Sequence, residues 1–346
     1  MISHRKLLIT NNPGVLPMEA PYSWIDAKEI TRDDITRLTE EFGVDSEFLA
    51  DVLDQDEQSR IEKEDDHIQL IIKLPVKADE DDDNSQVITT LGIMLYADKI
   101  LTICQNDSIV LEDLEKNRYR QYPLTTKEGF VLSILGRATQ VFIRLLKTVN
   151  RQKNKVEDQF QKHGAVMNFE LMQLLEIQKS LVYFSTSLAS NQALMEKLQK
   201  TSIFLMNNEE EREFLSDSII DNSQAVAMAN IYSNILNETM DAFSNVISNN
   251  MNIVMKRLTL ISLSLMFPTF ITSFWGMNIK LPLANNPFAW AFLAGACLIV
   301  AMIGMFILSD KKNRFVQREV NQREISEKRV RKEKIRNRRK RKTQDK

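Results

Sequence analysis

Polar and methionine side chains recur on one face of an apolar segment near the end of the chain. Ser262, Met266, Thr269 and Ser273 follow a 4-3-4 spacing, and the face continues toward the N-terminus through Leu258, Met255 and Asn252. In a helix, this spacing places all of these side chains on one side. Small polar residues there favour close packing of membrane helices. A polar face that grades into Met and Leu rings is also typical of a pore with a hydrophobic constriction, so both interpretations stay open.

This segment is one of two that are long enough to cross a membrane. Residues 258–275 and 288–308 are each apolar for about 18–21 residues, enough for a hydrocarbon layer of about 30 Å. The link between them, residues 276–287, carries only one charge, Lys280, and basic residues flank the pair on the other sides. The positive-inside rule therefore predicts a hairpin in the inner (plasma) membrane, with both termini cytoplasmic and the link outside.

The charges of the chain are distributed unevenly. Residues 1–255 have a net charge of −16, residues 256–309 contain three basic and no acidic residues, and residues 310–346 have a net charge of +11. This layout predicts an acidic body, a membrane anchor and a basic tail. The first residues contain no apolar core of signal-peptide length, so we expect the body in the cytosol. The cysteines, Cys104 and Cys297, fit neither a disulfide framework nor a zinc spacing.

The first part of the body has the pattern of a mixed α/β region. Residues 67–76 and 88–104 are rich in Ile, Leu and Val and bounded by turn residues, which predicts strands. Residues 35–54 predict two short helices broken at Gly43. The acidic segment 79–85 is expected to be a solvated hairpin loop, with a metal site as the alternative interpretation.

Long helices are predicted for the rest of the body. No proline lies between Pro123 and Pro268, and the prolonged lack of helix breakers predicts helices over 129–161, 169–199 and about 208–275. The last would be on the order of 100 Å long. Within it, Leu236, Met240, Phe243 and Ile247 form a 4-3-4 seam. The seam suits one amphipathic core helix, but the length without caps favours an oligomeric stalk.

The predicted fold class is an α+β cytosolic domain with long stalk helices, followed by a two-helix transmembrane hairpin. The expected segments are a cytosolic α/β domain at 1–125, cytosolic long helices at 126–207, a stalk helix at 208–257, a first span at 258–275, an outer loop at 276–287, a second span at 288–308 and a basic cytosolic tail at 309–346.

This arrangement resembles the CorA family of divalent-cation channels. The resemblance covers nearly the whole chain in architecture and is sharpest at about 217–312, where Gly276-Met277-Asn278 ends the first span. It implies a homopentameric funnel whose pore is lined by the first span. Positions matching the family's pore-facing residues are Asn252, Met255, Leu258, Met266 and Thr269, which lie on the face described above. Gly276, Met277 and Asn278 would form the selectivity filter.

The resemblance also assigns roles at the filter and at regulatory metal sites. A ring of Asn278 amide oxygens would hold hydrated Mg²⁺ through its water shell, while Gly276 would allow a tight chain reversal. "FLADVLD" places Asp51 in the metal position, with Ala50 where an acid is common. Asp217 falls on the partner carboxylate, and Asp241 on a further acidic position. Ordinary surface acids are the alternative interpretation of these aspartates.

Two features depart from the family pattern. The loop after the tripeptide, "IKLPLANNP", contains no acid that would gather cations at the outer mouth, and Lys280 is positive. The basic tail extends far beyond the usual short cluster. It would lie along anionic headgroups, with an attraction of about 1 kcal/mol for each basic residue, or form a disordered appendage.

These observations predict a passive Mg²⁺ uptake channel that cytosolic Mg²⁺ closes, so that Mg²⁺ is both transported and regulatory. Its partners would be copies of itself, membrane lipids and divalent cations, including cobalt and nickel, and not nucleic acid. An enzyme is not expected, because neither a P-loop nor a phosphorylated-aspartate segment occurs. The alternatives are a zinc or other divalent-cation transporter of the same superfamily and a non-conducting membrane-anchored scaffold. Met277 and the lack of a Cys/His cluster favour magnesium over zinc.

Overall fold

The computed structural model describes residues 2–5, 8–9, 18–76, 88–116, 124–163, 168–204, 206, 208–277, 288, 291–292, 294–299 and 302–303. The chain divides into two compact units, Met1–Ser244 and Asn245–Lys346, called here the first and the second unit.

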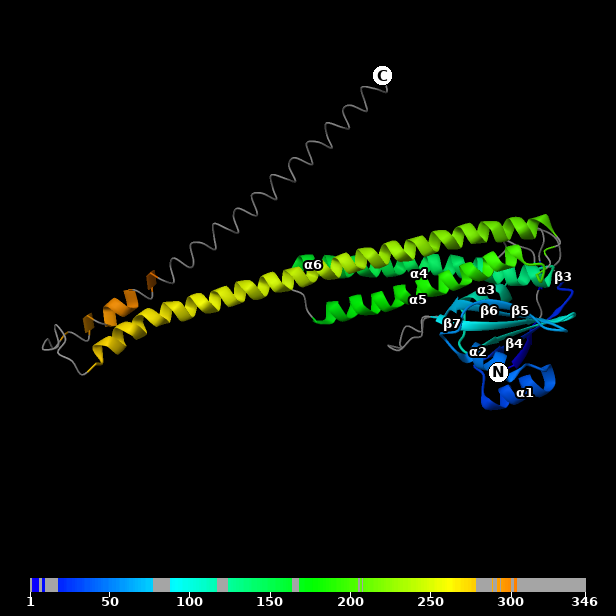
Figure 1. The fold of residues 1–346 in the computed structure, drawn as a ribbon, viewed down its shortest axis with the longest axis horizontal. Coiled ribbons are helices and arrows are strands. Elements are labelled where there is room, and N and C mark those ends of the chain that lie inside the picture. The colour runs from blue at the N-terminus through cyan, green and yellow to red at the C-terminus, as the bar shows by residue number, and fades with distance from the viewer. Residues whose placement is uncertain are drawn as a thin grey trace, which may run out of the picture. The chain divides into compact units, whose positions relative to one another are not determined.

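A six-stranded sheet lies in the first unit, with the strand order β1-β4-β8-β7-β6-β5 (Figure 1). Its strands are β1 (Ile2–Arg5), β4 (Ser23–Lys28), β5 (Arg60–Lys63), β6 (Ile68–Pro75), β7 (Ile88–Leu95) and β8 (Lys99–Cys104). Only β4 and β8 pair in parallel. A separate pair is formed by β2 (Leu8–Ile9) and β3 (Met18–Glu19).

The predicted strand regions are confirmed, and the second of them contains two strands. A turn at Tyr96–Asp98 separates β7 from β8, and the Tyr96 amide donates to the Lys99 carbonyl at 3.0 Å. The acidic segment 79–85 lies outside the described residues. The strands on either side of it, β6 and β7, pair antiparallel with Pro75 opposite Ile88.

The two predicted short helices are α1 (Arg32–Phe42) and α2 (Ser46–Leu53). Thr31 and Asp34 form a capping box at the start of α1, which satisfies two orphan donors there. Gly43 ends α1 with a φ of 69°, a left-handed conformation that glycine adopts without a Cβ clash. The break predicted at Gly43 is therefore confirmed.

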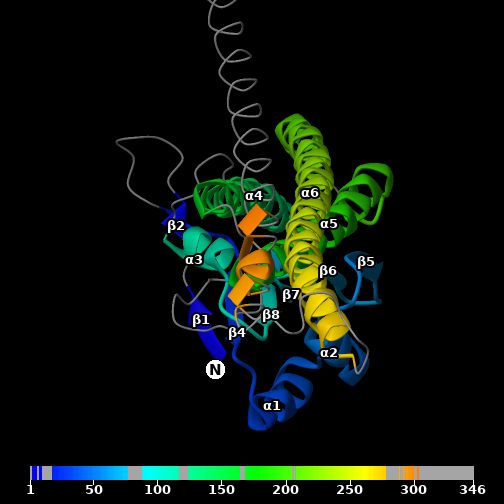
Figure 2. The same cartoon turned by 90° about the vertical axis from the view of Figure 1, so that its left-hand side faces the viewer.

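Both faces of the sheet are covered, because its strands alternate between two cores. Figures 1 and 2 show α1 and α2 on one side and the longer helices on the other. Along β6, Leu70, Ile72 and Leu74 join the larger core, which includes α3 (Ile109–Glu115) and the long helices, whereas Ile71 joins the smaller core with α2. Gly92 lets β7 approach α2, because an added Cβ would collide with Val52.

The three predicted long helices are α4 (Lys127–His163), α5 (Asn168–Lys200) and α6 (Glu209–Trp275). The seam, however, does not argue for an oligomer. Leu236 and Phe243 are buried in the core of the same chain and Met240 packs against it, while Ile247 is exposed. Over residues 236–243 the interpretation as a core helix is therefore the correct one, because α4 and α5 already cover this face.

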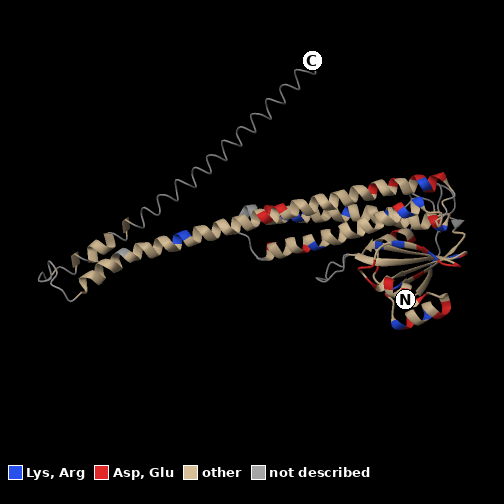
Figure 3. Cartoon of the chain, viewed as in Figure 1, with Lys and Arg blue, Asp and Glu red and all other residues tan. Residues whose placement is uncertain are grey.

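Two helices within the described ranges are long and apolar enough to cross a membrane. In α4 the apolar window is 72% buried, as in the core helix of a folded unit, whereas none of the window in α6 is buried. Lys256 and Arg257 are the last charged residues of α6, and the end of the helix after them is drawn without charge colours in Figure 3. In the second unit, the Cys297 thiol approaches the Pro268 carbonyl at 4.0 Å, so the second apolar stretch packs against α6.

Candidate functional site

The predicted pore-lining residues all belong to α6, and all seven are exposed in the single chain. They are Asn252, Met255, Leu258, Ser262, Met266, Thr269 and Ser273. The hydroxyl of Ser262 donates to the Leu258 carbonyl at 2.9 Å, and that of Thr269 to the Leu265 carbonyl at 2.8 Å. With their protons used inside the helix, these oxygens present lone pairs outward. Oxygens arranged in this way can accept hydrogen bonds from water.

The predicted filter begins where α6 ends. The Gly276 amide donates to the carbonyls of Thr272 at 3.0 Å and Ser273 at 3.2 Å, and the Met277 amide to that of Phe274 at 3.4 Å. Gly276 does not have a positive φ, and an added Cβ would lie 3.4 Å from the Thr272 carbonyl oxygen, an ordinary contact. The expectation that Gly276 allows a tight chain reversal stays a prediction, because α6 ends at Trp275 and the residues that follow Met277 lie outside the described ones. Asn278 lies outside the described residues.

Asp51 lies in the last turn of α2, and a guanidinium covers it. Arg60 Nη2 contacts Asp51 Oδ2 at 2.6 Å, and both side chains are 27% exposed. The same guanidinium binds Glu57 at 2.5 Å and Glu62 at 3.0 Å. A carboxylate at a helix C-terminus is unfavourable toward the helix dipole, so a cation at this position stabilises it.

A buried lysine fixes the loop that follows Asp51. Lys73 on β6 donates to the Gln55 carbonyl at 2.5 Å and to the Thr90 hydroxyl at 2.9 Å. Thr90 in turn donates to the Asp54 carbonyl at 2.8 Å. Burial lowers the pKa of Lys73, and the nearby Asp54, Asp56 and Glu57 partly offset this effect. The end of α2 is thus tied to the sheet.

Asp217 lies near the start of α6 and is exposed. It lines a hollow of about 300 Å³ together with Gly136, Thr139, Gln140, Phe214, Ser218 and Asp221. Asp221 was missed by sequence reasoning, although its position one helical turn after Asp217 puts it on the same face. Asp241, also on α6, is exposed and lies in a different part of the helix.

The aspartates do not form a metal site within one chain. In the part of the chain that the structure describes, no group of three or more His, Cys, Asp or Glu side chains is placed to hold a metal ion. Asp51 is on α2 and Asp217 on α6.

The comparison with known families decides the affiliation of the chain. The family described as CorA-like Mg2+ transporter protein matches residues 19–312. The chain belongs to the CorA family. The cobalt/magnesium transport protein CorA of Methanocaldococcus jannaschii is 29% identical over 290 residues, which are 82% of this chain and 89% of that protein. Transport, and not catalysis, is the activity of the CorA family.

Solved structures confirm the fold. The complete CorA magnesium transporter of Methanocaldococcus jannaschii matches with a TM-score of 0.70 at 24% identity, over 89% of this chain and 98% of that chain. Full-length CmaX matches with a TM-score of 0.59 at 17% identity, over 86% and 90% of the two chains. The predicted CorA architecture, an α+β domain with long helices and candidate membrane helices, is therefore correct.

Buried amides connect the Asp51 region of this CorA-family chain to its long helices, and sequence reasoning did not find them. On α5, Asn191 accepts from the Ser59 hydroxyl at 2.8 Å and donates to the Lys73 carbonyl at 2.8 Å. On α6, Asn222 donates to the Leu188 carbonyl and to Gln192, each at 2.9 Å. These contacts join β5 and β6 to α5, and α5 to α6.

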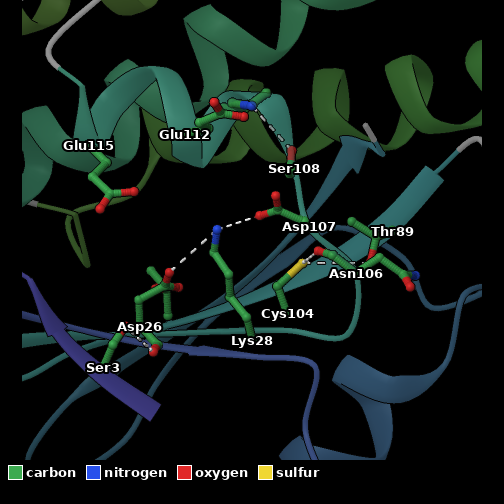
Figure 4. A network of polar contacts seen from close by, with 12 residues as sticks. Ser3, Asp26, Lys28, Thr89, Cys104, Asn106, Asp107, Ser108, Glu112 and Glu115 are labelled. Carbon is green, nitrogen blue, oxygen red and sulfur yellow. Dashed lines mark hydrogen bonds and ion pairs between the residues drawn. The ribbon is translucent and has the colours of Figure 1, made fainter. Parts of the chain in front are cut away.

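A second buried network lies where β4 and β8 end (Figure 4). The Asp26 carboxyl, which is fully buried, accepts from the Thr102 hydroxyl at 2.7 Å and contacts Arg5 at 3.1 Å. Lys28 reaches both Asp26 at 3.9 Å and Asp107. Burial raises the pKa of Asp26, an effect that Thr102, Arg5 and Lys28 partly counter. The network holds β1 to the sheet and carries none of the predicted site residues.

Proposed function

We propose that this CorA-family protein is a passive Mg²⁺ uptake channel, built as a homopentamer in the plasma membrane with α6 around the pore. The observation that carries the proposal is the exposed face of α6, from Asn252 to Ser273, which runs directly into Gly276 and Met277. A single chain leaves this face without a covering element among the described residues. A ring of copies would turn it into a lined channel.

The chemistry of the face suits a hydrated divalent cation. Mg²⁺ releases its water reluctantly and prefers oxygen partners. Hydroxyl oxygens that accept, and an Asn278 amide ring at the mouth, would bind the water shell weakly enough to let the ion leave. Met255, Leu258 and Met266 would supply apolar constrictions that close by losing water. A divalent ion entering down about 100 mV gains about 4.6 kcal/mol, so uptake requires no ATP.

The proposed orientation places both termini and the basic tail in the cytoplasm. Basic residues on both sides of the hairpin and the nearly uncharged link support it. The tail, residues 309–346, then lies next to anionic headgroups of the inner leaflet. The segment boundaries expected from the sequence, with spans at 258–275 and 288–308, belong to this proposal.

Cytosolic Mg²⁺ is proposed to close the channel through Asp51 and Asp217 of neighbouring copies, with Asp241 as a further acidic position. A bound ion would cancel the repulsion between carboxylates on bodies that carry a net charge of −16 each. The ion shifts the population only through its higher affinity for the closed state. The contacts through Asn191 and Asn222 would carry the change from β5 and β6 to α6.

Flux measurements test the conduction proposal. Purified protein in liposomes should admit Mg²⁺ down an inside-negative potential without ATP, and Co²⁺ and Ni²⁺ should be compared in the same assay. The cobalt/magnesium relative makes Co²⁺ the first of these to examine. Flux of Zn²⁺ in place of Mg²⁺ would support the zinc-transporter alternative. The absence of any flux from correctly assembled protein would favour the scaffold.

Protease protection tests the regulatory proposal. The parent should become resistant to limited proteolysis as Mg²⁺ rises toward millimolar concentrations. The double variant Asp51→Asn with Asp217→Asn should lose this protection and should conduct at Mg²⁺ concentrations that close the parent. Unchanged protection and closure in the double variant would mean that these aspartates are surface acids and that the sensor lies elsewhere.

A further inference from the structure

One guanidinium serves three carboxylates beside the proposed sensor. Arg60 uses Nη2 for Asp51, Nη1 for Glu57 and Nε for Glu62, at 2.6, 2.5 and 3.0 Å. All the nitrogens of the fork are therefore engaged, and each contacts a different residue. The Asp51 carboxylate therefore has a cation partner within its own chain.

The position of Arg60 is fixed by the fold. Arg60 is the first residue of β5 and lies opposite Ile71 in the sheet. The residue before it, Ser59, donates its amide to Ser190 at 2.6 Å and its hydroxyl to Asn191 at 2.8 Å, both on α5. Since the backbone is held on both sides, the guanidinium stays within reach of Asp51 and does not move away with a loop.

We propose that Arg60 is a built-in competitor of the divalent cation at Asp51 and sets the Mg²⁺ concentration at which the sensor fills. This inference rests on the proposed regulatory role of Asp51. An incoming ion must displace one of the three contacts of Arg60. Glu57 and Glu62 keep the guanidinium in place after displacement, so the exchange is reversible and Arg60 returns when the ion leaves.

The competition lowers the apparent Mg²⁺ affinity of the sensor by a moderate factor. Ion pairs that water reaches contribute only weakly each, because water screens them. The loss of this one contact corresponds to a change of up to about fivefold in apparent affinity. A sensor of free cytosolic Mg²⁺ needs low affinity. The Arg60 guanidinium lowers the affinity while all the carboxylates stay in place.

The test is a Mg²⁺ titration of protease protection in the full-length protein with Arg60→Gln. The midpoint should fall about two- to fivefold, because the competitor is gone. The matched control is Arg37→Gln, which removes the same charge from the exposed Arg37–Glu41 pair on α1 and should leave the midpoint unchanged. In the double variant with Asp51→Asn, Arg60→Gln should have no further effect.

A second variant guards against a folding defect. Arg60→Lys keeps the charge but lacks the planar fork, so it should give a midpoint between the parent and Arg60→Gln. An unchanged or higher midpoint in both variants would overturn the inference, because Arg60 would then only position Asp51. If Asp51→Asn alone leaves protection intact, the proposed sensor fails and the inference fails with it. Loss of protection in Asp51→Asn without a midpoint shift at Arg60 refutes the inference alone.

Discussion

Hydroxyls that bond within their own helix occur in both units, as Thr186 on α5 donates to the Val182 carbonyl at 3.0 Å, but the first unit adds buried amides that join separate elements. In the first unit, buried amides join separate elements, as Asn191 joins α5 to β6 and Asn222 joins α6 to α5. In the second unit, the hydroxyls of Thr259, Ser262 and Thr269 donate to carbonyls of their own helix, four residues earlier. The first pattern completes a fold within one chain. The second leaves the helix self-sufficient, as a lipid environment demands.

One helix shows this contrast along its own length. On α6, Leu236 is fully buried in the first unit, while Leu258 in the second is 57% exposed. The side chains are identical and the helix is continuous, so the difference comes from what surrounds it. The first unit supplies α4 and α5 as cover. The exposed half is free for lipid and for other copies of the chain.

The largest effect should come from the outer end of the second unit. Asn278→Ala removes the proposed ring of amide acceptors, so Mg²⁺ flux into liposomes should be lost while assembly stays intact. Asn286→Ala in the same loop is the control and should leave flux nearly unchanged. Parental flux in a correctly assembled Asn278→Ala protein would refute the assignment of the filter.

The same substitution at two points of α6 should have opposite consequences. Leu236→Ala leaves a cavity in the first unit and should lower its stability by about 2–5 kcal/mol. Leu258→Ala removes an exposed side chain, so it should leave thermal unfolding nearly unchanged and instead raise flux at closing Mg²⁺ concentrations. The measurements are the unfolding temperature of both variants and the Mg²⁺ flux through both variants. Equal destabilisation would show that both halves of the helix pack alike.

A smaller effect is expected where β7 meets α2. In Gly92→Ala, the added methyl would collide with Val52 and lie 3.1 Å from the Phe48 ring, so α2 must shift. Overpacking of this kind costs about 1–3 kcal/mol. Since α2 carries Asp51, the Mg²⁺ midpoint of protection should rise as well. Gly295→Ala, where an added methyl meets no described atom within 4 Å, is the control and should change neither the unfolding temperature nor the midpoint.

The sequence predicts the helices and strands of this chain better than it predicts which side chains and elements contact each other. The scarcity of proline and glycine over residues 124–267 was sufficient for three long helices, and Gly43 for the break between α1 and α2. The pairing of Asp51 with Arg60 depends on where β5 joins the sheet, and no local pattern contains that information. The seam at Leu236 has the same limit, because an apolar stripe does not tell whether its own chain or a copy covers it.

The smallest expected effect concerns Asp26 and the pH dependence of the first unit. Burial raises the pKa of this carboxyl from its ordinary 3.8 in the folded chain. The folded state therefore favours the protonated acid. The stability that Asp26 contributes is fully present below pH 3.8 and is lost as the pH rises through the higher folded value. The charged groups around it are Arg5, Lys28, Asp107 and Glu115. Because Arg5 and Lys28 stabilise the ionised carboxylate, the loss of stability with rising pH stays small.

The fluorescence of Trp24 can follow the titration of Asp26 and the unfolding of the first unit. Trp24 donates its indole N–H to the Thr102 hydroxyl at 2.8 Å, and that hydroxyl donates to Asp26. With Trp275→Phe and Trp290→Phe, Trp24 is the only tryptophan left. Between pH 4 and 8, the unfolding temperature of Asp26→Asn relative to the parent should rise with pH, by roughly 2–4 °C per kcal/mol. Asp34→Asn should show no such slope, because hydrogen bonds from Thr31 hold the pKa of Asp34 at about 2, below that window. A flat difference at Asp26 would mean that Arg5 and Lys28 fully compensate its burial.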